Sequence, residues 1–211
     1  MTIEQTLNNS DNQNNPKKSR TTLWIMVILF GLPYIAAIYF YYFADLSQIS
    51  NQTNYGTIIA PVRQVNDIPL KKLDNTDFKL SEMKGKWILI SIGQSSCQKS
   101  CQDNLYKMRQ IRKALGEERM RVNRVFLLTD TLNIESFISL LPDYSGMETI
   151  IPTDDNYQQL ISGFSITGES TEDGIFVVDP LGNYMMAYPK DADANKILKD
   201  IRRLLKVSKI G

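Results

Sequence analysis

The sequence predicts an α/β domain that follows a single N-terminal membrane helix. An uncharged apolar run at residues 23–43 is long enough, at ~1.5 Å per residue, to cross a hydrocarbon core of about 30 Å. Farther along the chain, two apolar, β-branched segments at 87–92 and 121–128 are each followed by a helical pattern. Alternation of buried strands and helices is typical of a core with parallel central strands.

The composition excludes several classes of function. The 211 residues include 24 basic and 23 acidic side chains, a net charge of +1, which disfavours nucleic-acid binding. The chain contains no histidine, which removes Ser-His and Cys-His catalytic pairs and the commonest metal ligand. Any chemistry must therefore use thiols, carboxylates, lysine or methionine.

The N-terminal segments predict a membrane anchor. Residues 1–20 are rich in Asn and Gln, as expected of a disordered cytoplasmic tail, and residues 21–43 form the single-pass anchor. Three basic residues precede the apolar run, and none follows before Arg63, so the N-terminus should stay in the cytoplasm. The alternative, a cleaved signal peptide, is disfavoured because no small-x-small site follows the long apolar run. We expect the inner (cytoplasmic) membrane, with the soluble domain in the periplasm.

The soluble domain is expected at residues 62–211, after a polar linker at 44–61. It should begin with an edge hairpin at 70–80, whose turn lies at 74–77, and continue into the strand at 87–92. The later elements are a strand at 121–128, a helix at 133–141 that Pro142 ends, a strand at 149–151, a helix at 155–164, a strand at 175–178, a D-P-L-G turn at 179–182, its antiparallel return at 183–188, and a closing helix at 192–205.

Both cysteines of the chain follow the strand at 87–92. A helix is expected to begin near Ser95 or Ser96, which places Cys97 in its first turn and Cys101 one turn farther in. Both sulfurs should then share one helix face, with α-carbons roughly 6 Å apart, so that a reversible disulfide is sterically feasible. The helix N-terminus and the nearby charge of Lys99 stabilise a thiolate, and Cys97 is expected to be the better nucleophile.

The alternative is a structural disulfide or two inert thiols. A bond between residues this close in sequence closes only a small loop, so it constrains the unfolded chain little and contributes little stability. The pattern therefore favours a redox role for the pair.

The order of elements resembles the thioredoxin fold over residues 62–211. Three details resemble the Sco/SenC branch of that fold, the cytochrome oxidase copper-insertion factors: the F-K-L-S-E-M-K-G-K-W lead-in at 78–87, the C-x-x-x-C spacing of Cys97 and Cys101, and the single N-terminal anchor. The sequence departs from that branch where it lacks the copper-binding histidine, near Thr171, and carries Gln98 and Gln102 beside its cysteines.

These observations lead to a main functional hypothesis of thiol-disulfide exchange. Cys97 attacks or is attacked, Cys101 resolves the mixed disulfide, and Asp130, at the end of the strand at 121–128, either assists proton transfer or caps the next helix. The partners would be thiols of another exported protein, and no cofactor is required. The resemblance implies a cytochrome oxidase subunit as the partner and assembly of its copper centre as the process.

Two other functions remain open from sequence. The chain could carry Cu(I) on the thiolates of Cys97 and Cys101, with Met185 or Met186 as a further soft ligand. It could instead be a non-enzymatic assembly scaffold, which would keep its function when both cysteines are replaced. A group of basic residues near the end of the cysteine helix could form an anion site. With acidic Glu117 and Glu118 close by, their spacing favours a solvated helix face; they are Arg109, Arg112, Lys113, Arg121 and Arg124.

Overall fold

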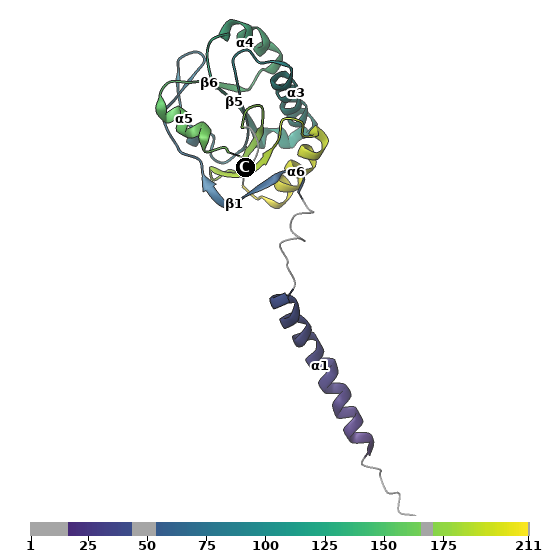
Figure 1. Ribbon diagram of the computed structural model, residues 1–211. Helices are drawn as coiled ribbons and strands as arrows, with labels where there is room; N and C mark the ends of the chain where they lie inside the picture. Colours follow the sequence, from purple (N-terminus) through teal and green to yellow (C-terminus); the bar gives the residue numbers. More distant parts are fainter. Residues whose placement is uncertain (1–16, 44–53, 166–170, 211) are drawn as a thin grey trace, which may run out of the picture. The chain divides into compact units, whose positions relative to one another are not determined.

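The computed structural model describes residues 17–43, 54–165 and 171–210 (Figure 1). The chain divides into two units, Met1–Gln52 and Thr53–Gly211. In the first unit a single helix, α1 (Lys17–Phe43), contains an apolar stretch at Arg20–Phe40 with a mean hydropathy of 2.2. The expected anchor is thus one long apolar helix, and it begins at Lys17, inside the segment expected to be a tail. The rest of that expected tail lies outside the described residues.

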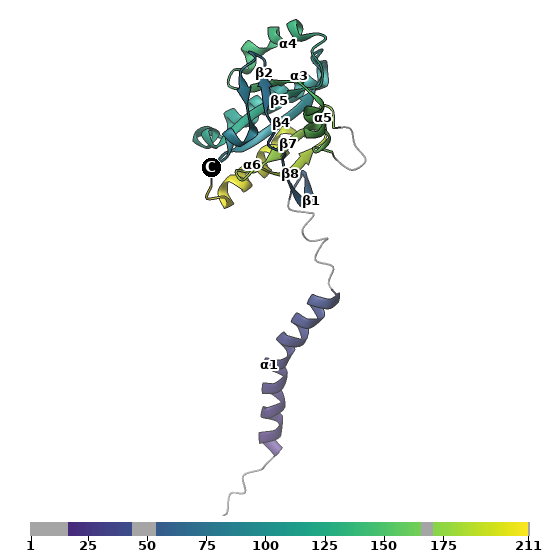
Figure 2. The same cartoon turned by 90° about the vertical axis from the view of Figure 1, so that its left-hand side faces the viewer.

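The second unit is built on one mixed sheet of eight strands. Its central strands β4, β5 and β6 are parallel, and the flanking strands pair antiparallel to them. Figure 2 shows the order from β2 near one edge to β1 at the other. In sheet order the strands are β1 (Thr57–Gln64), β8 (Asn183–Tyr188), β7 (Ile175–Val178), β4 (Trp87–Gly93), β5 (Val122–Leu128), β6 (Glu148–Ile151), β2 (Leu70–Lys72) and β3 (Asp77–Phe78).

Helices cover both faces of the sheet because its central strands are apolar on both faces. Along β4, Trp87 and Leu89 pack in the same cluster as α3 (Lys99–Ala114), α4 (Ile134–Leu140) and α6 (Ala194–Val207). Ile88 and Ile90 point to the opposite cluster, which α5 (Asp155–Ser162) covers. Figure 1 shows α3 and α6 on one side of the strands and α5 on the other. In the described part of the domain, three short 3₁₀ helices lie at Leu80–Met83, Gly116–Arg121 and Leu141–Tyr144.

Most of the predicted elements are confirmed, and one strand was missed. The strands expected at 175–178 and 183–188 have those bounds as β7 and β8. The strand β1 begins at Thr57, within the segment that the sequence predicted as linker. It forms the outer edge of the sheet beside β8, and Ile59 is its one buried residue, so it carries no alternating apolar pattern.

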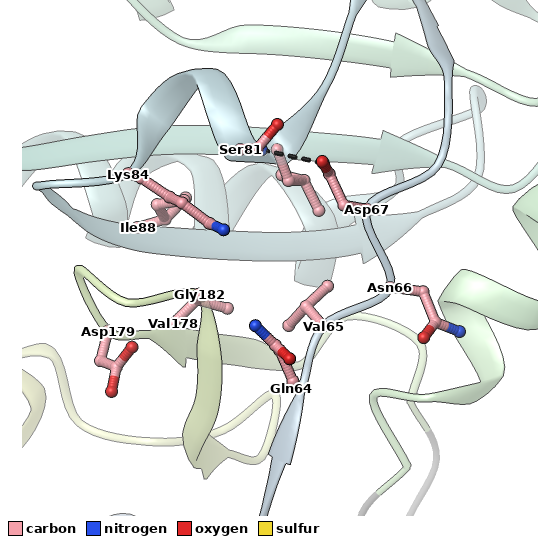
Figure 3. Close-up of a pocket in the computed structure, with 11 residues that line it drawn as sticks. Gln64, Val65, Asn66, Asp67, Ser81, Lys84, Ile88, Val178, Asp179 and Gly182 are labelled. Atoms are coloured by element: carbon pink, nitrogen blue, oxygen red, sulfur yellow. Dashed lines mark hydrogen bonds between the residues drawn. The ribbon is translucent and has the colours of Figure 1, made fainter.

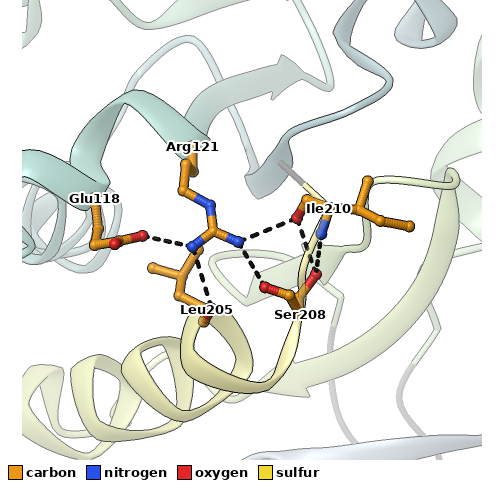
Figure 4. Close-up of polar contacts among 5 residues, drawn as sticks. All are labelled: Glu118, Arg121, Leu205, Ser208 and Ile210. Carbon is orange, nitrogen blue, oxygen red and sulfur yellow. Dashed lines mark hydrogen bonds and ion pairs between the residues drawn. The ribbon is translucent and has the colours of Figure 1, made fainter.

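Polar contacts hold the first and last segments of the domain in place, and those of Asp200 are the more deeply buried. Asp200 of α6, which is only 1% exposed, accepts hydrogen bonds from the amides of Tyr55 and Gly56 at 2.8 and 3.0 Å, just before β1. At the other end, the guanidinium of Arg121 pairs with Glu118 at 2.6 Å and donates to backbone carbonyls of the C-terminal segment (Figure 4). Those carbonyls belong to Leu205, Ser208 and Ile210, at 3.1, 2.9 and 3.2 Å.

Candidate active site

The two cysteines lie at the carboxyl end of the central strand β4 and are joined by a disulfide. Their α-carbons are 5.1 Å apart. Cys97 lies in the loop that leaves β4, and Cys101 lies in the first turn of α3. The carboxyl end of a central parallel strand is where α/β folds place their functional groups. The expected feasibility of the bond is confirmed.

The expected start of the cysteine helix is wrong by about one turn. The amide of Cys97 donates to the carbonyl of Gln94 at 3.1 Å, which closes a turn, and Cys97 itself has a φ of +32°. Gln98 is extended and acts as the N-cap, so α3 begins at Lys99. The unpaired amides at the helix N-terminus therefore stabilise a thiolate on Cys101 more than one on Cys97.

Both sulfurs are nearly buried and face one polar depression. Cys97 is 1% exposed and Cys101 is 2% exposed, and both pack in the apolar cluster with Leu105 and Phe126. The depression has a volume of about 310 Å³. A partner thiol can therefore approach the bond from this side. The residues that line the depression are Gln94, Ser96, Cys97, Gln98, Ser100, Cys101, Glu172 and Asp173.

Asp173 is a site residue that the sequence analysis missed. The hydroxyl of Ser100, in the first turn of α3, donates to its carboxylate, and the side-chain amide of Asn104 donates to its backbone carbonyl. The position that a Cβ would take at Gly93 lies 3.2 Å from Oδ1 of Asp173 and 3.8 Å from Sγ of Cys101. The carboxylate and the Cys101 sulfur thus both lie within 4 Å of one point beside Gly93, and both residues line the depression.

A backbone hydrogen bond also holds Asp173 in position. Its amide donates to the carbonyl of Ile92 at 2.8 Å, and its φ is +59°. A signal for this residue exists in the sequence, because Asp173 lies two residues before the first residue of β7, Ile175. An antiparallel neighbour of β4 must begin where β4 ends.

Asp130 lies at the end of β5, where it was expected, and its contacts support the loop before Cys97. Its Oδ1 accepts hydrogen bonds from the hydroxyl of Ser95 and from the amide of Leu132, the latter at 3.0 Å. The same hydroxyl of Ser95 accepts from the amide of Asn133 at 2.8 Å. Asp130 thus ties the cysteine loop to the start of α4, and a role in proton transfer stays a prediction.

The residues around the disulfide do not complete a three-ligand metal site. Among the described residues, no group of three or more Cys, Asp or Glu side chains is placed to hold a metal ion. Met186 pairs with Val177, which pairs with Leu89 in the middle of β4, so the methionine lies away from the carboxyl end of that strand. Two cysteine thiolates, once reduced, are the soft donors that the site offers.

A second depression lies at the opposite end of β4. It has a volume of about 230 Å³ and is lined by Ile88, Val178 and Lys84, among others (Figure 3). Its carboxylates already have partners. Hydrogen bonds from Ser81 hold the pKa of Asp67 below its usual range, and the carboxylate of Asp179 accepts the amides of its own turn. The chemistry therefore concentrates at the cysteine end.

A disulfide at the end of the central strand of such a helix-flanked sheet is the arrangement of thioredoxin-like domains. A family model described as "Transmembrane-like, thioredoxin-like, C-terminal domain" matches residues 87–208, and this chain belongs to that family. No curated protein matches the chain.

Solved structures include Sco proteins among the neighbours of this fold. Yeast Sco1 with copper bound is 17% identical, with 69% of this chain and 90% of that chain covered and a TM-score of 0.58. BsSco, described as a member of the Sco family of cytochrome c oxidase assembly proteins with a disulfide switch, is 15% identical over 72% and 99% of the two chains, with a TM-score of 0.54. The thioredoxin domain of a Bacteroides vulgatus thiol-disulfide oxidoreductase is 14% identical, with 68% of this chain and 96% of that chain covered and a TM-score of 0.53. At these identities the likeness shows the fold, and it confirms the predicted resemblance at that level.

Proposed function

We propose that this chain is a membrane-anchored thiol-disulfide oxidoreductase whose redox centre is the Cys97–Cys101 pair. The observation that carries the proposal is the position of the disulfide, between the N-terminus of α3 and the polar depression at the end of β4. A bond that spans a sequence separation of 4 stabilises the folded chain little. Its place beside an open depression suits exchange with another protein's thiols.

The exchange proceeds in two balanced steps. A partner thiolate attacks the sulfur of Cys97, the disulfide breaks, and Cys101 leaves as a thiolate that the N-terminus of α3 stabilises. A second partner thiol then attacks the mixed disulfide, forms the partner's own disulfide and releases Cys97. The partner loses two electrons and two protons, and this chain ends with two thiols. The reverse sequence reduces a partner disulfide.

The location and partner follow from the anchor and from the structural neighbours. With the basic N-terminal flank in the cytoplasm, the domain lies in the periplasm, where exported dithiols are its partners. The likeness to BsSco, described as belonging to a family of cytochrome c oxidase assembly proteins, supports a copper-binding dithiol of an oxidase subunit as the substrate. Under this proposal the chain would act in assembly of the oxidase copper centre.

The test compares single and double cysteine variants of the full chain in a neutral detergent, with a dithiol peptide as substrate. Cys97→Ser should abolish exchange. When the peptide is supplied in its disulfide form, the Cys97 thiolate of Cys101→Ser should attack that disulfide, release one peptide thiol and accumulate a mixed disulfide through Cys97, visible by mass spectrometry. Ser96→Ala, a neighbour with no sulfur, is the matched control. Exchange at the wild-type rate in Cys97→Ser would overturn the proposal. Survival of oxidase assembly in cells when both cysteines are serine would instead identify a scaffold.

A Cu(I) carrier is the second candidate, favoured by the copper that yeast Sco1 holds. Cys97 and Cys101 would supply two thiolates after reduction, and among the described residues no Asp or Glu joins them in a group of three ligands. We expect the reduced chain to take one equivalent of Cu(I) in competition with a chelator of known affinity, and Cys101→Ser to lose it. No uptake by the reduced wild type would remove this candidate.

A further inference from the structure

A further depression, separate from the two described above, has a volume of about 330 Å³. It lies between the last turns of α3, the strand β5 and the 3₁₀ helices Gly116–Arg121 and Leu141–Tyr144. Its lining includes five cationic side chains and one carboxylate. We call it the basic depression; it is lined by Arg109, Arg112, Lys113, Arg119, Arg124, Pro142, Asp143 and Ser145.

The buried member of this set is Arg124, which is only 3% exposed. Side chains alternate along a strand, so Arg124 shares a face of β5 with Val122 and Phe126, the face that α3 covers. Its Nη2 donates to the carbonyl of Ser145 at 2.7 Å. Its Nε and Nη1 are buried without a hydrogen-bond partner in the described part of the chain. A buried guanidinium with two empty donor groups is costly unless an acceptor joins it.

The surrounding charges add to this cost. Burial, together with the smaller effect of the positive charges of Arg112 and Arg109, lowers the pKa of Arg124 to about 10. Within the described residues, Arg109, Lys113 and Arg119 have no hydrogen-bond or ion-pair partner. The C-terminal dipole of α3 accounts for cations on that helix, but it does not account for a buried arginine on β5.

The acidic residues closest to these cations in sequence, Glu117 and Glu118, are not among the residues that line the basic depression. Glu118 pairs with Arg121, and Arg121 is committed to the C-terminal carbonyls (Figure 4). Asp143 is the one carboxylate in the lining. The sequence-based interpretation of a solvated helix face is therefore wrong for Arg124, which is buried, and Arg121 belongs to a different contact. It holds for Lys113, which is exposed.

We propose that the basic depression binds a phosphate-bearing ligand, with Arg124 at its floor and the other cations around the entrance. Guanidinium groups match the tetrahedral oxygens of phosphate through paired N–H donors, and a dianion offsets much of the excess positive charge. The volume lies at the lower end of the range for small-molecule sites, which suits a phosphate with a small attached group or a lipid headgroup.

The test is calorimetric titration of the full chain, in a neutral detergent at constant ionic strength, with inorganic phosphate. We expect saturable binding with a Kd of about 1 mM or tighter. Arg124→Met, which fills the same space without charge, should weaken binding at least about tenfold. The double variant Arg109→Gln/Lys113→Gln alters only the entrance and should weaken it about threefold or more, so the test survives if Arg124→Met does not fold.

The matched control is Lys209→Gln, which removes one exposed charge outside the depression and should leave the Kd unchanged. Two lipid arms identify the source of the phosphate. If a lipid headgroup is the ligand, phosphatidic acid in phosphatidylcholine nanodiscs should suppress the phosphate titration. If the ligand is soluble, the titration should persist both in these nanodiscs and in nanodiscs of phosphatidylcholine alone. Either result supports a phosphate site. The absence of saturable binding in every arm, or equal affinity in wild type and both variants, would overturn it.

Discussion

At the scale of single residues, two carboxylates differ in what they contact. Asp173 lines the depression beside Cys101, and its carboxylate accepts the hydroxyl of Ser100. Asp130 contacts Ser95 and an amide of the next loop. A base for a thiol must lie within reach of it, directly or through one water. Asp173 lines the same depression as Cys101, and Asp130 is not among the residues that line it. We therefore expect Asp173, more than Asp130, to accept the proton at Cys101, and a variant of each residue tests this choice.

This assignment predicts a pH-dependent defect. Asp173→Asn should slow exchange with a dithiol peptide about 10- to 100-fold near pH 7, and the rate should recover toward pH 9, where thiols with an ordinary pKa of about 8.5 ionise without help. The measurement is the pH profile of the single-turnover rate. Asp130→Asn is the control, because a loop-positioning residue should lower the rate equally at every pH. An Asp173→Asn profile parallel to that of the wild type would contradict the assignment.

At the scale of elements, the edge strand β1 is held to α6 by one buried carboxylate. Oδ2 of Asp200 accepts the amides of Tyr55 and Gly56 and, at 3.0 Å, the hydroxyl of Tyr188 on β8. Burial raises the pKa of Tyr188 above its ordinary value, and the charge of Asp200 raises it further, so the hydroxyl keeps the proton that it donates. Three elements therefore depend on a single acceptor.

Loss of that acceptor should loosen the edge of the sheet. Asp200→Ala leaves two amides and a hydroxyl without partners and should lower the free energy of unfolding by roughly 2–4 kcal/mol. Thermal unfolding followed by circular dichroism measures the change, and hydrogen exchange should show faster exchange in β1 first. Asp191→Ala, at an exposed position shortly before α6, should change stability by less than about 0.5 kcal/mol. Equal stability of the two variants would refute the role of Asp200.

At the scale of the whole molecule, the sequence predicted the central sheet well because its strands are buried on both faces. Apolar runs bounded by turn residues locate β4, β7 and β8 without any knowledge of their neighbours. The edge strand β1 was not predicted because it is defined by its pairing with β8, and it lacks the buried apolar residues that a sequence pattern reveals. The start of α3 escaped because a local turn with a positive φ at Cys97 interrupts an otherwise helical pattern.

The candidate site was predictable only in part. Spacing alone located Cys97 and Cys101 and made their disulfide feasible. The place of Asp173 in the site follows from the pairing of β7 with β4, and the sequence alone does not show which strands pair. Arg124 had a usable signal, since alternation along β5 puts it on the buried face with Val122 and Phe126, but its basic neighbours in sequence suggested a solvated surface.

The reduction potential of the Cys97–Cys101 pair tests the central claim most directly. The full chain in a neutral detergent is equilibrated against glutathione buffers, and the fraction of disulfide is read by thiol alkylation and mass spectrometry. An exchange protein should give a potential between about −120 and −270 mV, the range of known thiol-disulfide oxidoreductases. A potential below about −300 mV is that of a static structural bond and would contradict the proposed function.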